Sequence, residues 1–433
     1  MKIAIAGFGS EGKVSLNYFR AKFPDAEFTI FDEREKLDDA PNFAKTVSEK
    51  DNSAKTVSDE NNFAKLVSGE NAFAKIRDFD LVLRSPSVAP RKIAPENEKF
   101  WSATNEFFAT CPAPIVGVTG TKGKGTTATM IAEILRAAGE NVHLLGNIGV
   151  PALEKLAEIR ATDVVVFELS SFQLWDAEFS PRVAVVLRIE ADHLDVHADF
   201  ADYVRAKSQI ARHQTAADAV IYYEKNQWSR DIANLSAGRK IAYPDDISFD
   251  ETVLHVPGAH YVEDAKAAIA ACRALNPRIS DAIIEKGLSN FRAMPHRLEL
   301  VRELNGVAYY DDNFSASFPS LDVAVKAFPD NPIILIAGGF DRGLNNFAEI
   351  AKSIDDSTVK FAILLGQTAP KIAAKLRVEH QICSDLTEAI RAAQRLAKSG
   401  DVVVMSPGAP SFDMWRNFYA RGDEFQKLVK NLK

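Results

Sequence analysis

One segment constrains the fold of this 433-residue chain more than any other: a glycine-rich sequence between an apolar run and a helical pattern. Residues 117–127 read GVTGTKGKGTT, after the buried-strand pattern Ile115–Val118 and ahead of a helical pattern over 124–138. In such a context glycines let backbone N–H groups converge on phosphate oxygens, and a lysine adds a fixed charge. The segment predicts a nucleotide phosphate loop, although a glycine-rich turn without a ligand gives the same pattern.

The match to the strict phosphate-loop pattern, G-x4-G-K-[ST], is incomplete. Val118 occupies the first glycine position, and Gly125 follows Lys124 where Ser or Thr is usual. The order of strand, loop and helix is still the one that a phosphate loop requires. We therefore expect Lys124 to supply the charge that faces the phosphates.

The rest of the chain alternates apolar runs with helical patterns, in three parts. The first part opens with the apolar run 2–6, the glycine turn 7–12, a helical stretch and a second apolar run at 28–31. Strands separated by helices imply parallel sheets. The predicted fold class is α/β with three domains: a Rossmann-like domain at 1–110, a P-loop ATPase-like domain at 111–297 and a C-terminal Rossmann-like domain at 298–433.

Residues 42–77 contain a ten-residue repeat, NFAKTVSEKD, NSAKTVSDEN and NFAKLVSGEN, followed by the partial copy AFAKIR. A period of ten is far below the roughly 20–50 residues of most solenoid repeats. We interpret the repeat as a tandem duplication inside a polar surface loop of the first domain, an insertion that adds no core. A partner-binding role is the alternative.

Composition narrows the class of protein. The 52 Lys and Arg against 59 Asp and Glu give a net charge of −7, which argues against nucleic-acid binding through a basic surface. The three cysteines are too few for a disulfide framework. No apolar run approaches the roughly 20 residues of a membrane span, and the N-terminal run ends too early for a signal peptide. We expect a cytoplasmic protein that binds neither nucleic acid nor a membrane.

Acidic residues and histidines follow two further apolar runs of the central part. Glu168 ends the run DVVVFE, and Ile189 precedes EADHLDVH. A carboxylate at the C-terminal end of a strand beside a phosphate loop is well placed to hold Mg²⁺ on nucleotide phosphates. Taken alone, Glu168 also fits a solvated strand-end acid, and Asp192 also fits the cap of a helix.

The N-terminal glycine turn, taken alone, predicts a nicotinamide cofactor. GFGSEG opens a helix, and Asp32 lies about twenty residues beyond Gly12, at the spacing of a dinucleotide fingerprint. A glycine turn at a helix N-terminus suits any diphosphate equally well. The motif therefore predicts diphosphate binding without deciding which compound carries the diphosphate.

Several motifs occur in one order over most of the chain: GTKGKGTT, GNIG at 146–149, ELSSFQL, DHLDVH, Tyr203 with Lys207, PHR at 295–297 and SPGAPSFDMWRNFYARGDEF. In this order and spacing they resemble the Mur ligase superfamily, over residues 1 to about 430 apart from the repeat. The resemblance implies an ATP-dependent amide-bond ligase of peptidoglycan precursor synthesis. It would add D-glutamate to UDP-N-acetylmuramoyl-L-alanine through an acyl phosphate.

The resemblance also implies roles for residues of this chain. ATP would be bound by Gly120, Thr121, Lys122, Gly123, Lys124, Gly125, Thr126, Asp264, Arg297 and Asp312. The catalytic group would be Lys124, Glu168, His193 and Lys207. Two Mg²⁺ ions would be held by Thr126, Glu168, His193 and Lys207, the last as a carbamate formed with CO2. The UDP-linked substrate would be contacted by Ser10, Glu11, Asp32, Ser87 and Asn147, and the amino acid by Arg342, Ser411 and Phe418. Without the resemblance, Lys207 fits a solvated helix lysine.

Three departures from the family pattern affect these sites. His260–Asp264 reads HYVED where His-Asn-x-x-Asn is usual, and Asp311–Ser317 reads DDNFSAS where NDSKATN is usual. Arg342 stands where a lysine usually binds the added glutamate, and a guanidinium is not an equivalent group. A ligase of the same superfamily for another amino acid or a folate-like acceptor is therefore one alternative.

A nucleotide-binding switch or a dehydrogenase is the alternative from a different class of protein. The ligase hypothesis predicts a monomer whose partners are the small molecules ATP, D-glutamate and UDP-N-acetylmuramoyl-L-alanine.

Overall fold

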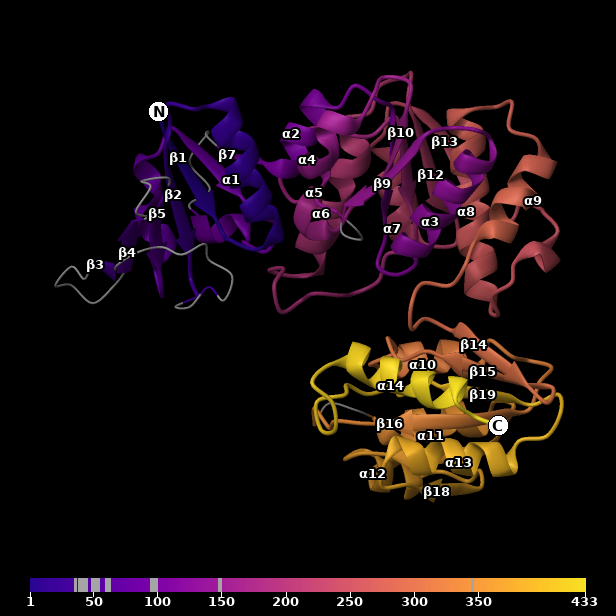
Figure 1. Ribbon diagram of the computed structural model, residues 1–433. Helices are drawn as coiled ribbons and strands as arrows, with labels where there is room; N and C mark the ends of the chain where they lie inside the picture. Colours follow the sequence, from indigo (N-terminus) through magenta and orange to yellow (C-terminus); the bar gives the residue numbers. More distant parts are fainter. Residues whose placement is uncertain are drawn as a thin grey trace. The chain divides into compact units, whose positions relative to one another are not determined.

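The computed structural model describes residues 1–34, 37, 46–47, 55–58, 64–93, 100–146, 150–343 and 346–433. These residues group into two compact units, Met1–Phe249 with Asp264–Leu288, and Asp250–Glu263 with Ser289–Lys433. The first unit holds two of the three sheets that the described residues form, and the second unit holds the third. The α/β class predicted from the alternating pattern is confirmed (Figure 1).

The first sheet and its helices come from residues 1–110. Their elements are β1 (Lys2–Ala6), α1 (Ser10–Lys22), β2 (Glu27–Asp32), β3 (Thr46–Val47), β4 (Lys55–Ser58), β5 (Lys65–Ser68), η1 (Ala72–Asp78), β6 (Leu81–Arg84), η2 (Pro90–Ile93), β7 (Phe100–Ser102) and α2 (Ala103–Thr110). The strand order is β3-β4-β5-β2-β1-β6-β7. The pairs of β4 with β3 and with β5 are antiparallel, and the other pairs are parallel. This arrangement brings the turn after β1 to the carboxyl ends of β2 and β6.

The interpretation of residues 42–77 as an insertion that adds no core is wrong for its C-terminal part. β5 pairs in parallel with β2, and its residues Leu66 and Val67 are buried. The following η1 buries Phe73 and Ile76. The reason lies in the third copy of the repeat, which carries leucine where the first two copies carry threonine, so that its strand offers apolar surface to the core. In the first two copies the structure describes β3 and β4; their other residues lie outside the described ones.

The second sheet comes from the central part of the chain. The elements of this part are β8 (Ile115–Thr119), α3 (Lys124–Ala137), β9 (Val142–Gly146), α4 (Ala152–Lys155), η3 (Leu156–Glu158), β10 (Val164–Glu168), α5 (Ser171–Leu174), β11 (Val183–Val186), α6 (Phe200–Arg212), β12 (Ala219–Tyr223), α7 (Gln227–Asn234), β13 (Arg239–Tyr243), η4 (Glu251–Val253), α8 (Ala259–Leu275) and α9 (Asp281–Asn290). Of these, η4 and the first residues of α8 belong to the second unit. The strand order is β13-β12-β11-β8-β10-β9, and all pairs are parallel. β8 therefore lies between β10 and β11, and the carboxyl ends of these three strands meet at one edge. Ligands of open α/β sheets bind at such an edge.

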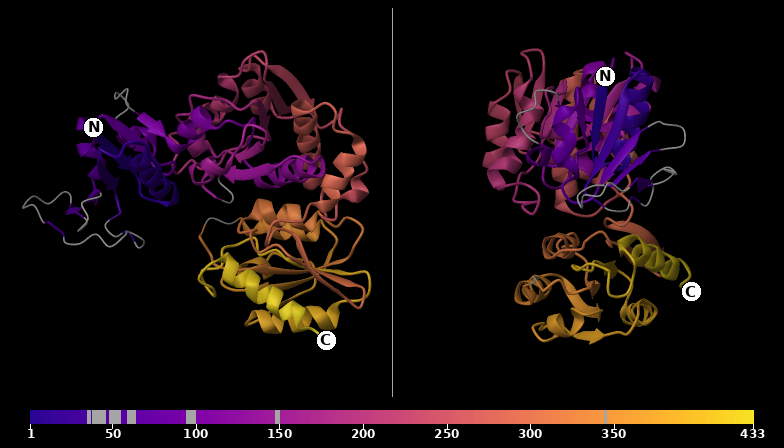
Figure 2. Two further views of the ribbon diagram at one scale, coloured as in Figure 1. Left: turned by 45° about the horizontal axis from the view of Figure 1, so that its top comes forward. Right: turned by 90° about the vertical axis from the view of Figure 1, so that its left-hand side faces the viewer.

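The third sheet lies in the second unit. Its elements are β14 (Glu299–Leu304), β15 (Val307–Asp311), α10 (Phe318–Val325), β16 (Ile333–Gly338), α11 (Phe347–Asp355), β17 (Val359–Leu365), α12 (Ala369–Ala373), β18 (His380–Ile382), α13 (Leu386–Leu396), β19 (Val402–Met405) and α14 (Phe418–Lys430). The order is β14-β15-β19-β16-β17-β18, and β14 is antiparallel to β15. Helices cover both faces of this sheet, and one face packs against α13 and α14 (Figure 2).

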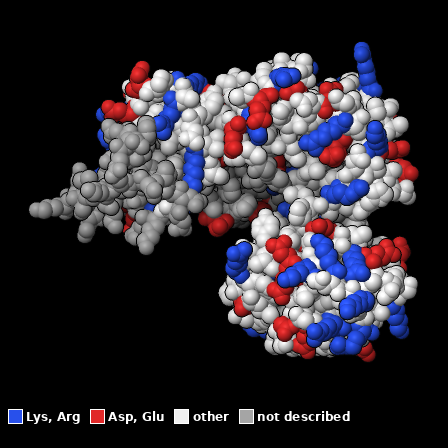
Figure 3. Space-filling view, viewed as in Figure 1, with Lys and Arg blue, Asp and Glu red and all other residues white. Residues whose placement is uncertain are grey.

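Charged side chains of both signs are interspersed on the face of the second unit that is seen in Figure 3. In the part of the chain that the structure describes, no helix has the length and apolar character needed to cross a membrane.

Candidate active site

The loop between β8 and α3 has the close packing that a phosphate loop needs. Gly123 adopts a φ of +82°, and a Cβ at this position would lie 2.4 Å from Asp264 Oδ1. A Cβ on Gly120 would lie 2.6 Å from Leu187 Cβ. Side chains are excluded at both positions, so the backbone N–H groups of the loop stay uncovered by the loop's own Cβ atoms. This cradle fits a nucleotide phosphate.

Two lysines converge on the backbone carbonyl of Gly120. Lys124 Nζ donates to the Gly120 oxygen at 3.2 Å and to the Thr121 oxygen at 3.1 Å. Lys207, on α6, donates from Nζ to the same Gly120 oxygen at 2.8 Å. Lys207 is 1% exposed. The pKa of Lys207 is well below its usual range, because the side chain is buried and because the Lys124 charge lies nearby. The interpretation of Lys207 as a solvated helix lysine is wrong.

The other members of the loop differ in exposure. Thr121 and Thr126 are buried, and Thr121 Oγ1 lies 3.0 Å from Tyr203 Oη. Gly125 is also buried, in the first turn of α3. Lys122 is exposed and pairs with Asp192 at 3.6 Å. Among the predicted ATP-binding residues Gly120–Thr126, Lys122 is therefore the exposed one, and the others are buried or partly buried.

Glu168 is the last residue of β10 and is 2% exposed, so it is not a solvated strand-end acid. In the sheet it stands beside Val118 of β8. Its negative charge acts on Lys207. Carboxylate and hydroxyl oxygens are the ligands that Mg²⁺ prefers. The buried oxygens of Glu168 and Thr126, at the edge that carries the phosphate loop, therefore fit this ion.

His193 lies beyond β11 in a left-handed conformation, with a φ of +53°. Its side chain is 48% exposed, and its ring lies 4.9 Å from the Phe172 ring. Asp192 does not cap the next helix; Asp199 does, by accepting a bond from the N–H of Asp202. The alternative interpretation of Asp192 as a helix cap is wrong.

In the part of the chain that the structure describes, Glu168 and His193 do not meet with a third His, Cys, Asp or Glu side chain in one ion site. Across the described residues, the group of three His, Cys, Asp or Glu side chains whose ligand atoms lie within 4.8 Å of one another is His296, Glu299 and Asp311. This group lies in the second unit and is distant in the sequence from the loop between β8 and α3.

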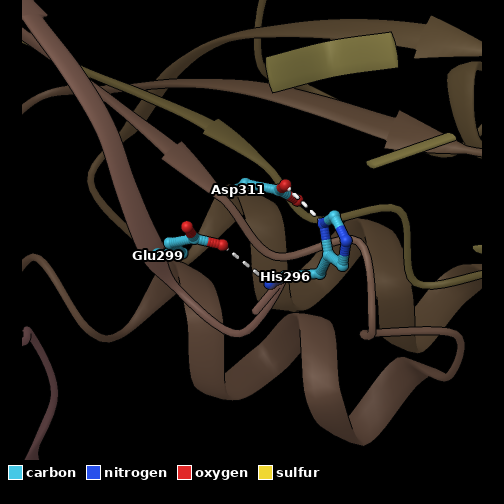
Figure 4. Close-up of side chains that lie close together, drawn as sticks. All are labelled: His296, Glu299 and Asp311. Atoms are coloured by element: carbon cyan, nitrogen blue, oxygen red, sulfur yellow. Dashed lines mark hydrogen bonds and ion pairs between the residues drawn. The ribbon is translucent and has the colours of Figure 1, made fainter. Parts of the chain in front are cut away.

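In that group the side chains are already hydrogen-bonded (Figure 4). His296 Nδ1 lies 2.7 Å from Asp311 Oδ2, and the backbone N–H of His296 donates to Glu299 Oε2 at 3.0 Å. Gln426 Nε2 donates to both carboxylates at 2.9 Å. The bond to Asp311 raises the pKa of His296. The three side chains are therefore joined to one another and to Gln426 by hydrogen bonds, which tie the segment before β14 to β15 and α14.

At the N-terminal turn, Asp32 holds the backbone rather than facing solvent. Its Oδ2 accepts from the N–H of Phe8 at 2.8 Å and from Arg34 Nη2 at 2.8 Å. Burial would raise the pKa of Asp32, but the bonds from Arg34 and Phe8 outweigh burial and lower it. The Asp32 carboxylate therefore fixes the glycine turn through its bond to Phe8.

The other residues predicted to contact the UDP-linked substrate differ in their exposure. Ser10 and Ser87 are exposed. Glu11 Oε1 accepts from Gln173 Nε2 at 2.9 Å, and burial raises the pKa of Glu11. Asn147 lies outside the described residues. Ser10 and Ser87 are thus open to a ligand, whereas Glu11 bonds to a residue of the second sheet's domain.

In the second unit, Arg297 and Phe418 flank one aromatic ring. The Arg297 guanidinium lies 3.9 Å from the centroid of the Phe314 ring, and the Phe314 and Phe418 rings are 5.0 Å apart. Ser411 is buried and Arg342 is exposed. Phe314 stands where the family usually has a lysine. An aromatic ring therefore replaces a charged side chain in the segment Asp311–Ser317, which differs from the family pattern.

Asp312 is buried and accepts hydrogen bonds from three groups. They are the N–H of Leu298, at 3.2 Å, and the hydroxyls of Ser406, at 2.7 Å, and Ser315. Burial raises the pKa of Asp312 to about 7. Asp312 thus joins the start of the second unit's sheet to the segment after β19.

Sequence reasoning missed Arg421, which is 0% exposed. Its Nε donates to Asn313 Oδ1 at 2.7 Å, and its Nη1 donates to the Ala409 oxygen at 3.2 Å. It therefore ties the segment after β15 to the segment after β19. The signal was present: Arg421 shares a helix face with the buried Phe425 and Val429, four and eight residues on.

Family comparisons match two stretches of the chain. The Mur ligase middle domain matches residues 118–253, and the Mur ligase, glutamate ligase domain, matches residues 296–408.

Two curated relatives are similar over most of their length. The UDP-N-acetylmuramoylalanine–D-glutamate ligase of Acetivibrio thermocellus is 36% identical over 397 residues, which cover 83% of this chain and 84% of the relative. The protein of the same name from Streptococcus suis is 36% identical over 385 residues, covering 82% of this chain and 84% of the relative.

Solved structures share the fold at low sequence identity. UDP-N-acetylmuramate–alanine ligase of Thermotoga maritima has a TM-score of 0.59 at 16% identity, over 100% of both chains. Folylpolyglutamate synthase of the same organism has a TM-score of 0.57 at 15% identity, over 76% of this chain and 93% of that one.

Proposed function

Because this chain belongs to the Mur ligase family, we propose that it is an ATP-dependent ligase that adds D-glutamate to UDP-N-acetylmuramoyl-L-alanine. The choice of reaction rests on relatives of that name at 36% identity over 83% of the chain. The observation in the structure that supports it is the loop Gly120–Gly123, on which Lys124 and Lys207 converge beside the buried Glu168. A dehydrogenase has no need of this arrangement.

The proposed reaction has two steps. A carboxylate oxygen of the muramoyl substrate attacks the γ-phosphorus of ATP, and the bond to the β-phosphate oxygen breaks, which gives an acyl phosphate and ADP. The amine of D-glutamate then attacks the acyl carbon, loses a proton and expels inorganic phosphate. Lys124 would neutralise charge on the transferring phosphoryl group.

Mg²⁺, when bound, would neutralise charge on the phosphates of ATP. Thr126, Glu168, His193 and Lys207 would hold two ions. Gly120, Thr121, Lys122, Gly123, Gly125 and Asp264 would line the nucleotide site. The proposed ATP contacts of Arg297 and Asp312 rest on the family motif alone.

Lys207 would act as a carbamate in this scheme. The neutral amine attacks the carbon of CO2, an N–C bond forms and one proton is lost to solvent, which leaves an anionic group able to bind Mg²⁺. The buried amine supports this step, since its pKa is well below the usual range. We expect Lys207→Ala to lower kcat by a hundredfold or more, and short carboxylic acids to restore part of it. A fully active Lys207→Ala variant without additives would rule out the carbamate.

The substrate contacts remain proposals. Ser10, Glu11, Asp32, Ser87 and Asn147 would receive the UDP-linked substrate. Arg342, Ser411 and Phe418 would receive D-glutamate, with Arg342 holding the side-chain carboxylate through two N–H groups. The reaction consumes ATP and a nucleotide-linked sugar, so we place it in the cytoplasm; that the chain is a monomer stays a prediction.

The deciding experiment measures ADP release with and without each substrate. We expect release that requires both UDP-N-acetylmuramoyl-L-alanine and D-glutamate, with L-glutamate and other amino acids inactive. ADP release without an acceptor would instead indicate a nucleotide-binding switch. Release with a different amino acid or a folate-like acceptor would identify another ligase of the family.

A further inference from the structure

A buried chain of three polar side chains takes no part in the reaction described above. Its histidine, His197, packs against the ring of Tyr203, whose hydroxyl lies 3.0 Å from Thr121 Oγ1 of the loop between β8 and α3. His197 Nδ1 lies 3.0 Å from Asp202 Oδ2, and His197 Nε2 lies 3.0 Å from Ser171 Oγ. All three residues are under a tenth exposed, at 2% for Ser171, 2% for His197 and 6% for Asp202. Helices α5 and α6, which carry Ser171 and Asp202, pack against each other (Figure 1).

The surroundings of His197 hold the ring in one orientation. The Phe172 ring stacks on it at 5.5 Å, and the Trp175 ring lies 4.2 Å away. A carboxylate can only accept, so the proton sits on Nδ1, and Nε2 accepts from the Ser171 hydroxyl. Trp175 Nε1 and Arg205 also donate to Asp202, which keeps the carboxylate in place.

The geometry is that of a serine–histidine–aspartate triad, but its burial excludes a nucleophilic role. Ser171 is 2% exposed, and its hydroxyl is committed to His197. No substrate carbonyl can approach a covered hydroxyl. We therefore interpret the three residues as a structural group, which holds parts of the chain in place.

Each member of the chain belongs to a segment that carries a proposed Mg²⁺-holding group. Ser171 follows Glu168 by three residues, at the start of α5. The backbone N–H of His197 donates to the His193 oxygen at 2.9 Å. Asp202 stands on α6 five residues before Lys207. Through its two ring nitrogens His197 thus joins the start of α5 to α6, and its backbone N–H bonds to His193, four residues before it.

We propose that His197 is a positioning residue, which sets the spacing of Glu168, His193 and Lys207 for the Mg²⁺–nucleotide complex. This inference rests on the proposed function, because it assigns a role toward the ion that the ligase would use. Residues that orient metal ligands typically contribute about 10–100-fold to metal affinity. Removing His197 breaks the bonds to Ser171 and Asp202 without removing any of the proposed ligands, while the bond from Trp175 to Asp202 remains.

The test measures Mn²⁺ binding by electron paramagnetic resonance in the presence of a non-hydrolysable ATP analogue. We expect His197→Ala to weaken Mn²⁺ binding by tenfold or more, and Ser171→Ala to weaken it by a smaller factor. In turnover, both variants should need more Mg²⁺ for half-maximal rate, with KM for D-glutamate unchanged. A loss of general stability alone would not shift the Mg²⁺ requirement.

His143 offers a matched control. Its Nε2 lies 3.0 Å from Asp163 Oδ2, so it makes a similar bond in the same unit, but near the start of β9. We expect His143→Gln to bind Mn²⁺ as tightly as the unchanged protein.

The outcomes separate the two proposals. If the unchanged protein does not bind Mn²⁺ with the analogue, the proposed function is wrong. If it does, and His197→Ala binds equally well, the positioning role is wrong. Should His197→Ala fail to fold, Ser171→Ala decides alone, because it removes one hydroxyl and leaves the His197–Asp202 bond in place.

Discussion

At the scale of single residues, Gly123 and Gly139 have nearly the same backbone but different surroundings. Their φ angles are +82° and +89°; a Cβ would lie 2.4 Å from Asp264 Oδ1 at Gly123, whereas nothing lies within 4 Å at Gly139. Both alanine variants carry the cost of a left-handed conformation, about 1 kcal/mol. We expect Gly123→Ala to weaken ATP binding by more than tenfold, measured by calorimetry, and Gly139→Ala to leave it within twofold. Equal affinities would mean that the loop does not hold the nucleotide.

Asp312 predicts a pH dependence of stability. Its pKa is raised to about 7 in the folded chain, against about 3.9 in an unfolded one. The folded chain therefore binds this proton more tightly, and the stability it contributes is lost as the pH rises through about 7. We expect the thermal midpoint of Asp312→Asn, relative to the unchanged protein, to rise between pH 5 and pH 8. The same difference at both pH values would contradict this assignment.

Single residues also show which features could be predicted from the sequence and which could not. The glycine-rich turn between β8 and α3 was predictable because glycine spacing and a strand–helix context are local features. The environment of Lys207 was not, because its partner Gly120 lies 87 positions away. The partner of Arg421 was not predictable for the same reason, since Asn313 is 108 positions distant, although the helix face that it shares with Phe425 was.

At the scale of elements, β5 should contribute more to the stability of the fold than β3 and β4 do. β5 pairs with β2 and buries Leu66 and Val67, whereas β3 and β4 extend the sheet beyond it. We expect Leu66→Ala to lower the free energy of unfolding by about 2–5 kcal/mol in denaturant titrations. Deleting residues 42–61, two whole copies of the repeat, should leave stability within about 1 kcal/mol, since β5 keeps its place beside β2.

If the deletion destabilises the chain as much as Leu66→Ala does, the outer strands are part of the core. The repeat also shows why the element was misread. Its polar composition is typical of a loop, but each copy contains the segment A-K-x-V-S, and in the third copy, where leucine stands in place of threonine, this segment forms β5 and is buried against β2.

At the scale of the whole molecule, the predicted domain boundaries near residues 110 and 298 remain a proposal. The second unit includes residues from Ser289 onward, because His296 bonds to Asp311 and Leu298 to Asp312. We expect a fragment 289–433 to unfold cooperatively and to be about 1–3 kcal/mol more stable than a fragment 298–433, by denaturant titration. The His296→Ala change in the longer fragment should remove most of the difference. Equal stabilities would place the boundary at 298.

The sequence by itself determined the α/β class, the glycine-rich turn between β8 and α3, and the family, because helix and strand periodicity, glycine turns and motif order are local features of the chain. Only the tertiary structure decided which distant side chains meet: Lys207 with Gly120, and His197 with both Ser171 and Asp202. The physical reason is that a hydrogen bond between separate elements depends on how those elements pack. Packing in turn depends on buried surface summed over many residues, which no local pattern contains.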